Sequence, residues 1–149
     1  MNNNDWKENF IKNKVTDCYL LKIPKIKDRR GNLAVIENNQ LPFDMKRVYY
    51  LYDVPAGAYR GGHAHKAQNE LLIAVSGSFE VRINDGQTIK KIILNRPDRG
   101  LLIPVGIWRD LKDFSQGSVC LVLNSGAFDE DDYIRQFEDF QHLKNQINA

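Results

Sequence analysis

The chain has 149 residues, of which 42% are hydrophobic and 27% are charged, and its formal net charge at pH 7 is +2. This length fits one domain with a substantial core. The small net charge argues against nucleic acid or a membrane surface as a partner, and no stretch approaches the roughly 20 apolar residues of a membrane span.

Residues 1–14 form a predicted N-terminal extension that is polar apart from Trp6, Phe10 and Ile11. It forms either a short helical turn that docks an aromatic side chain or a partly ordered leader. It lacks the apolar middle of a signal peptide. The only cysteines, Cys18 and Cys120, are expected to be free buried thiols rather than a disulfide. Together these features predict a cytoplasmic protein.

Short apolar runs separated by turn signals begin at residue 15. The first predicted strand covers residues 18–23 and stops at Pro24. A turn over residues 28–31 leads into a second strand over residues 33–36. Residues 47–52 are rich in branched and aromatic side chains and predict a third strand.

The stretch 57–77 is expected to organise the functional site. If the chain is extended from Gly62 onward, His63 and His65 project to the same side of a sheet. The apolar run 71–75 predicts a buried strand closed by a turn. The two imidazoles are therefore expected at the mouth of a strand that the core holds in place.

The second half of the chain continues the same pattern. Residues 79–83 alternate between apolar and polar, and Asp-Gly at 85–86 predicts a hairpin whose returning strand is 89–94. Further strands are predicted over residues 101–103 and 119–123.

The acidic run 129–132 predicts a solvated helix start. Tyr133, Phe137, Phe140 and Leu143 recur at helical spacing, which predicts one amphipathic C-terminal helix. Many short strands without βαβ alternation predict a single β-sandwich or β-barrel domain over residues 15–149.

Two motifs in this chain resemble those of the cupins. Gly57, His63-Ala64-His65, Glu70 and Gly77 have the spacing of the first cupin motif. In the second motif Pro104 and Gly106 are present, but Arg109 stands where a histidine is expected. The resemblance implies an all-β small cupin, a double-stranded β-helix or jelly-roll barrel, with a C-terminal α-helix.

More narrowly, the chain resembles the small cupins that act as 3,4-ketoisomerases on dTDP-4-keto-6-deoxyglucose. The similar segments are DRRGNLAVIE at 28–37, KRVYYLYDVP at 46–55, RGGHAHK at 60–66, GLLIPVGIWRDL at 100–111 and CLVLNSGAFDEDDYI at 120–134. The resemblance implies a homodimer paired through its sheets, with the N-terminal strand as an element that the subunits exchange. It also implies a place in amino-sugar synthesis for a surface polysaccharide, in lipopolysaccharide O-antigen or an S-layer glycan.

A metal-binding cupin uses His63, His65, Glu70 and the second-motif histidine. Two histidines and one carboxylate can still hold iron or zinc, and a metal-dependent dioxygenase is one alternative function. Arg109, however, places a fixed positive charge there that cannot become a ligand. We therefore expect a site without a metal ion or another cofactor.

The reaction implied by the resemblance moves a ketone from C4 to C3 of the sugar through an enediolate. Histidine suits this proton transfer because its pKa lies near neutrality. His63 is assigned as the base and His65 as the partner that orients it or carries the proton, although the sequence leaves their order open. Arg109 is the candidate for stabilising the negative charge on oxygen.

Several further residues are candidates for binding the substrate. Arg60 either binds the diphosphate or forms a salt bridge at the rim. Arg47 and Tyr49 share one face of their strand, and the sequence does not fix whether that face points inward. Gly62 permits close approach of a ligand, and Glu70 either anchors a histidine or lies on the wall. The alternative functions are a 3,5-epimerase and a sugar-binding cupin without catalysis.

Overall fold

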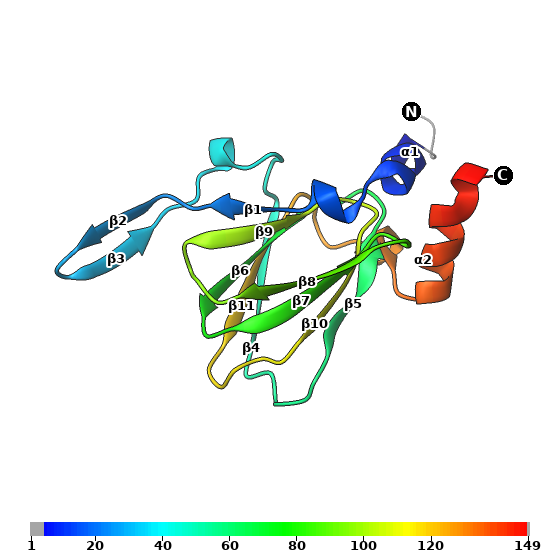
Figure 1. The fold of residues 1–149 in the computed structure, drawn as a ribbon. Helices are drawn as coiled ribbons and strands as arrows, with labels where there is room; N and C mark the ends of the chain where they lie inside the picture. The colour runs from blue at the N-terminus through cyan, green and yellow to red at the C-terminus, as the bar shows by residue number, and fades with distance from the viewer. Residues whose placement is uncertain (1–4, 149) are drawn as a thin grey trace.

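The computed structural model describes residues 5–148, which fold into two facing five-stranded antiparallel sheets (Figure 1). The strand order is β1-β9-β6-β11-β4 in the first sheet and β12-β5-β10-β7-β8 in the second. A separate two-stranded hairpin, β2-β3, projects away from the barrel. The predicted all-β jelly-roll barrel with a C-terminal helix is confirmed.

The elements have the following bounds. The strands are β1 (Tyr19–Lys22), β2 (Lys25–Asp28), β3 (Gly31–Ala34), β4 (Arg47–Tyr52), β5 (Arg60–His65), β6 (Glu70–Ser76), β7 (Phe79–Asn84), β8 (Ile89–Leu94), β9 (Arg99–Ile103), β10 (Trp108–Lys112), β11 (Val119–Asn124) and β12 (Tyr133–Ile134). The α-helices are α1 (Asp5–Lys12) and α2 (Phe137–Lys144), and four short 3-10 turns are η1 (Val15–Asp17), η2 (Asn38–Gln40), η3 (Glu130–Asp132) and η4 (Asn145–Asn148).

The main core lies between the two sheets. Phe79, Val81 and Ile83 alternate along β7 with less buried residues, so the two-residue period of the strand directs all three inward. They belong to the same buried cluster as Leu72 of β6 and Val122 of β11 in the other sheet. The apolar residues of the alternation predicted for residues 79–83 therefore lie on the inward face of the barrel.

Strand β6 is buried on both faces. Its other face carries Leu71 and Ile73, which pack in a second cluster with Ile23 and Leu41. The segment that precedes β4 thus covers the outside of the first sheet. Because neither face of β6 meets solvent over residues 70–74, its sequence is a continuous apolar run rather than an alternating one.

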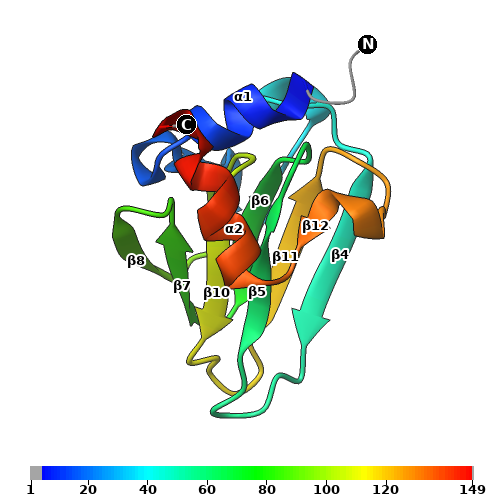
Figure 2. The ribbon, with the colours of Figure 1, turned by 90° about the vertical axis from the view of Figure 1, so that its right-hand side faces the viewer.

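The two helices pack beside β5 and β10 at one end of the barrel (Figure 2). Phe10 of α1 and Phe140 of α2 are fully buried, so α1 is the predicted helical turn that docks an aromatic. Residues 1–4 of the predicted extension lie outside the described part. Lys144 donates hydrogen bonds to the carbonyls of Phe10 and Asn13, which lie at the end of α1 where carbonyls lack helical partners. Burial lowers the pKa of Lys144 to about 8.

Two further features of the described chain concern its cysteines and its helices. Cys18 and Cys120 are free and buried, as predicted. Burial raises the pKa of the Cys18 thiol to about 12 and that of Cys120 further, so both behave as inert core residues. Within residues 5–148, neither helix has the length and apolar character needed to cross a bilayer.

The prediction for residues 129–133 was wrong. Tyr133 belongs to β12, and α2 begins only at Phe137. The acidic run forms the 3-10 turn η3 after Asp129, whose side chain accepts a hydrogen bond from the N–H of Asp131. Asp132, expected in solvent, is buried because its carboxylate has partners inside the protein.

Candidate active site

One cavity of about 560 Å³ opens between the two sheets and contains the predicted site residues except His65. The predicted residues that line it are Arg47, Tyr49, Arg60, Gly62, His63, Glu70 and Arg109. His65 is fully buried behind this wall. These residues come from the four strands β4, β5, β6 and β10, and the first and last of them are more than 60 positions apart in the sequence. The fold brings them to one surface.

The cavity identifies the inward face of β4. Arg47, Tyr49 and Leu51 line it, whereas Tyr50 and Tyr52 are exposed on the outer side. The guanidinium of Arg47 lies 5.3 Å from the ring centroid of Tyr49, and its Nη2 donates to an amide oxygen of the loop before β6. The sequence had left the direction of this face open.

The glycines that precede the histidines form a bulge in β5. In the pairing with β10, Arg109 lies opposite His63 and the next residue lies opposite Gly61, so Gly62 is an extra residue on β5. Gly61 and Gly62 have φ values of +85° and +57°, which favour glycine. A Cβ at Gly61 would also lie only 3.1 Å from the Arg109 carbonyl oxygen. A bulge of this kind re-aims a side chain, and here it brings His63 beside Arg109.

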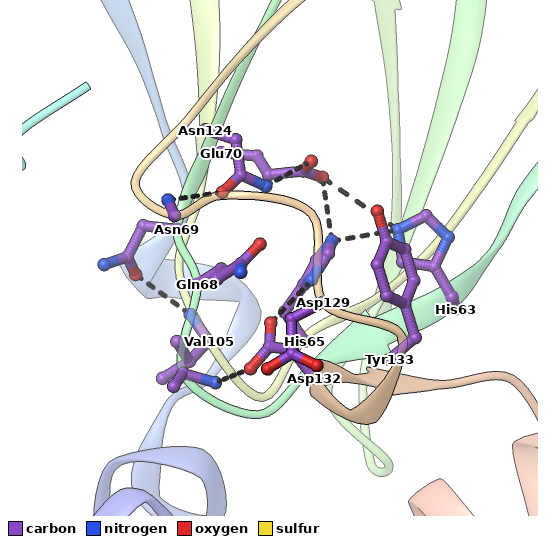
Figure 3. Close-up of polar contacts among 12 residues, drawn as sticks. His63, His65, Gln68, Asn69, Glu70, Val105, Asn124, Asp129, Asp132 and Tyr133 are labelled. Atoms are coloured by element: carbon purple, nitrogen blue, oxygen red, sulfur yellow. Dashed lines mark hydrogen bonds and ion pairs between the residues drawn. The ribbon is translucent and has the colours of Figure 1, made fainter. Parts of the chain in front are cut away.

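The two imidazoles face each other through Nε2, with 3.1 Å between these atoms (Figure 3). The Nδ1 of His63 lies 2.9 Å from the carbonyl oxygen of Gly61, and the Nδ1 of His65 lies 2.9 Å from Oδ2 of Asp132. A carbonyl and an ionised carboxylate only accept hydrogen bonds, so each Nδ1 carries a hydrogen. The Nε2 atoms are therefore the nitrogens left to exchange a proton.

Glu70 connects the histidines to the rest of the wall (Figure 3). Its Oε1 accepts from Nη1 of Arg109 at 2.6 Å and lies 3.3 Å from Nε2 of His65. Its Oε2 accepts from the hydroxyl of Tyr49 at 2.6 Å and from the amide of Asn124 at 2.9 Å. Burial alone would raise the pKa of Glu70, but the two imidazoles and Arg109 hold it well below its usual value. Glu70 is thus an ionised centre that anchors both charged and neutral partners.

Arg109 points into the barrel and is 1% exposed. It is therefore not a surface arginine stacked on the neighbouring Trp108. Besides Glu70, it donates from Nη2 to the carbonyl of Ile107. Its Nε has no hydrogen-bond partner within residues 5–148. One N–H donor of this buried guanidinium is thus unpaired at the cavity wall.

The environment of His63 favours its neutral form. Burial lowers the pKa of His63, and the positive charges of Arg109 and His65 lower it further, against the opposing effect of Glu70. A neutral imidazole with its hydrogen on Nδ1 has a free lone pair on Nε2. His63 can therefore accept a proton at neutral pH.

His63, His65 and Glu70 each offer one atom to a common point, within 4.8 Å of one another. Their spacing alone would suit a metal ion. The charge balance does not, because Nη1 of Arg109 already lies 2.6 Å from the Glu70 oxygen that faces the histidines. A divalent cation there would lie beside a fixed guanidinium charge, so the residues do not fit the metal centre of other cupins.

Sequence reasoning missed three residues of this network: Asn124, Asp132 and Tyr133. The Tyr133 ring centroid lies 4.9 Å from that of His63 and 4.5 Å from that of His65. Asn124 ends a buried strand, and Asp132 lies in an acidic run that is typical of a solvent-exposed turn. Neither position carries a local signal, because its role depends on a partner on another strand.

Comparisons with known proteins find similar proteins over most of this chain. The family model FdtA, described as WxcM-like, C-terminal, matches residues 16–145. A TDP-4-oxo-6-deoxy-alpha-D-glucose-3,4-oxoisomerase of Aneurinibacillus thermoaerophilus is 41% identical, over 87% of this chain and 94% of the relative. Among solved structures, the WlaRB TDP-quinovose 3,4-ketoisomerase of Campylobacter jejuni is 45% identical, with a TM-score of 0.81 over 85% of this chain and 98% of that one.

Two other solved structures define how far the likeness extends. QdtA, a sugar 3,4-ketoisomerase of Thermoanaerobacterium thermosaccharolyticum in complex with TDP, has a TM-score of 0.87 and 37% identity, over 91% of this chain and all of that one. A dTDP-4-dehydrorhamnose 3,5-epimerase of Bacillus anthracis has a TM-score of 0.71 but only 21% identity, over 83% of this chain and 80% of that one. The epimerase likeness shows the fold alone.

Proposed function

Because the chain belongs to the FdtA family of WxcM-like, C-terminal proteins, we propose that it is a sugar-nucleotide 3,4-ketoisomerase. The substrate is dTDP-4-keto-6-deoxyglucose, and the product is its 3-keto isomer. The observation that carries this proposal is the imidazole of His63 on the cavity wall, whose Nε2 faces that of the buried His65 and which is backed by a buried carboxylate and a guanidinium. Isomerisation of this kind needs a base that can accept and return one proton.

The position of each histidine supports its role. His63 lines the cavity and has a lone pair on Nε2, because its hydrogen is on Nδ1, so it is the base that removes the C3 proton and returns it at C4. His65 does not line the cavity, and it acts on the substrate through His63. The two enediolate oxygens acquire negative charge between these steps, and Arg109 stabilises that charge from the same wall.

The remaining predicted residues hold the nucleotide sugar. Arg60 begins β5 at the cavity rim and is exposed, which leaves its planar guanidinium free to bind a diphosphate. Arg47, Tyr49 and Gly62 line the inner wall, where they contact the sugar and the first phosphate. Glu70 holds Tyr49 and Arg109 in place and does not itself transfer the proton.

Proton exchange tests the proposal directly. The protein is mixed with dTDP-4-keto-6-deoxyglucose in deuterated buffer, and the ring protons are followed by NMR. We expect deuterium at C3 together with the 3-keto product. The variant His63→Asn should reduce turnover by about 100-fold or more while keeping the fold, whereas His142→Asn, on the exposed face of α2, is the matched control. Absence of both exchange and product in the wild type would refute the proposed function.

The same experiment separates the alternatives. A 3,5-epimerase would also incorporate deuterium at C5, and a sugar-binding protein without catalysis would bind the nucleotide with no exchange at any carbon. Metal independence has its own test, since Arg109 occupies the Glu70 oxygen that a metal would need. Activity should survive dialysis against a chelator, and loss of activity that zinc or iron restores would contradict it.

We also propose a homodimer in which the β2-β3 hairpin of each subunit packs on the other. Every residue of this hairpin is exposed, including Ile26 at 60% and Leu33 at 57%. An isolated two-stranded hairpin is marginal in water, and a second copy would cover these side chains. Light scattering should give twice the chain mass, and Ile26→Lys combined with Leu33→Lys should give a monomer. A monomeric wild type at working concentration would refute the dimer.

The two buried free cysteines fit a reducing compartment, and we place the protein in the cytoplasm. There its 3-keto product would supply the synthesis of an amino sugar for a lipopolysaccharide O-antigen or an S-layer glycan. A 3-ketone is the group that an aminotransferase needs to install nitrogen at C3.

A further inference from the structure

Asp132 is a buried acidic residue to which the mechanism above gives no role. It is 7% exposed, and its Oδ2 accepts from Nδ1 of His65 at 2.9 Å. Its Oδ1 accepts from the backbone N–H of Ala67 at 2.7 Å. The backbone fixes this position, because β12 pairs with β5 directly after Asp132 and its carbonyl accepts from the N–H of Lys66. Figure 3 shows the carboxylate beneath the His65 ring.

We propose that Asp132 is a positioning residue that keeps the hydrogen of His65 on Nδ1, so that Nε2 of His65 can accept a hydrogen bond from the proton that His63 takes from the substrate. This inference rests on the proposed ketoisomerase function. The C3–H bond breaks, its electron pair forms the enediolate, and the proton bonds to Nε2 of His63. This N–H donates to Nε2 of His65. Within the enediolate the hydroxyl proton moves from the C3 oxygen to the C4 oxygen, and as the C3 carbonyl forms, the proton held on His63 bonds to C4, which leaves both rings neutral.

The distance between the two rings supports this arrangement. Two ring nitrogens 3.1 Å apart form a hydrogen bond only when one of them carries a hydrogen. Both Nδ1 hydrogens are already donated, to Gly61 and to Asp132. A hydrogen bond between the two Nε2 atoms therefore forms only when the pair holds one additional hydrogen, and the pair is arranged to hold the transferred proton.

The charged groups around the two histidines also support this arrangement. His65 lies between two carboxylates, with Asp132 at Nδ1 and Glu70 at 3.3 Å from Nε2. His63 lies farther from Glu70, at 4.0 Å, and close to Arg109. A proton held between the two rings thus has a carboxylate on each side of His65 and a guanidinium near His63, and it stays there only until it passes to C4.

The substitution Asp132→Asn tests the role of the carboxylate with little change in shape. The N–H of Ala67 needs an acceptor, so the amide oxygen of the asparagine stays at Oδ1. The amide NH₂ then faces Nδ1 of His65, which must give up its hydrogen and carry it on Nε2 instead. That hydrogen points at His63 and blocks the transfer. We expect kcat to fall by about 100-fold or more, as wrong tautomers do elsewhere, with KM little changed because Asp132 does not line the cavity.

A spectroscopic readout distinguishes positioning from a structural effect. Long-range ¹H–¹⁵N spectra of the histidine rings should show the hydrogen of His65 on Nδ1 in the wild type and on Nε2 in Asp132→Asn. Asp132→Glu keeps the carboxylate and should restore the wild-type tautomer and part of kcat. Asp131→Asn removes an exposed carboxylate from the same run and should match the wild type in both measurements.

Failure of this inference is distinguishable from failure of the proposed function. If the wild type exchanges deuterium at C3 but Asp132→Asn retains wild-type kcat, the inference is overturned. It is also overturned if the wild-type spectrum places the hydrogen of His65 on Nε2, a result that needs no variant to fold. If the wild type itself exchanges nothing, the ketoisomerase function is the part that fails, and the spectrum still decides the tautomer.

Discussion

Two antiparallel strand pairs in this protein have opposite environments. In β5-β10, which forms the cavity wall, His63, His65 and Arg109 are buried, and each has hydrogen-bond partners inside the protein. In β2-β3 every residue is exposed, and the apolar Ile26 and Leu33 face solvent. Buried polar groups are costly unless paired, so the hydrogen bonds of the wall limit how these side chains can be arranged. The hairpin has no such constraint within one chain, and we infer that its packing comes from a second copy.

The largest expected change in the free energy of unfolding comes from removing the charge at the centre of the wall. Glu70→Gln removes the carboxylate that faces the buried guanidinium of Arg109 at 2.6 Å. An uncompensated buried charge costs about 3–5 kcal/mol, which urea unfolding would measure. Glu130→Gln is the control, since Glu130 pairs with Arg135 at the same 2.6 Å but both are about half exposed. It should cost about 0–1 kcal/mol. Equal losses for the two variants would show that burial does not distinguish the pairs.

A smaller effect is expected from the neutral donor to the same carboxylate. Tyr49→Phe removes the hydroxyl that donates to Oε2 of Glu70 at 2.6 Å. Hydrogen bonds to charged groups are worth about 1.5–3 kcal/mol. Tyr50→Phe, one residue along on the exposed face of β4, should change the free energy of unfolding by less than about 0.5 kcal/mol. If both variants unfold at the wild-type urea concentration, the hydroxyl of Tyr49 does not support the wall.

The lowered pKa of His63 should make both the stability and the activity of the protein sensitive to acid. The pKa of His63 is lowered from 6.5, first by burial and then by Arg109 and His65. The unfolded state therefore binds more protons than the folded state below pH 6.5, so stability is lost as the pH falls through this range. The acid limb of kcat/KM, which reports the free base, should have its midpoint below pH 6.5. A midpoint at or above 6.5 would contradict the assignment of His63 as the base.

The smallest effect is expected in the hairpin. Leu33→Ala, at a protein concentration where the chain is monomeric, should change the free energy of unfolding by less than about 0.5 kcal/mol. The same substitution at Leu101, fully buried between the sheets, should cost about 2–5 kcal/mol. Thermal or urea unfolding of both variants measures the difference. A large loss from Leu33→Ala in the monomer would mean that the hairpin packs on its own barrel.

The sequence by itself determined the β-rich architecture and most of the site. The alternation in β7, the continuous apolar run in β6 and the hairpin signal at residues 85–86 are local patterns that packing preserves. The His63-Ala64-His65 spacing placed both imidazoles on one face because a strand has a period of two. These features follow from short-range geometry, which neighbouring residues specify without the rest of the chain.

Only the tertiary structure decided which polar residues are partners. Strand β10 carries Arg109 inward and has no apolar alternation, so its pattern does not indicate a buried strand. Asp132 has the local sequence of a solvated turn, yet it is buried because β12 pairs with β5 and sets the carboxylate against His65. The burial of a charge depends on a compensating group that can lie anywhere in the chain. Here that group is 67 residues away, a distance over which no local pattern carries information.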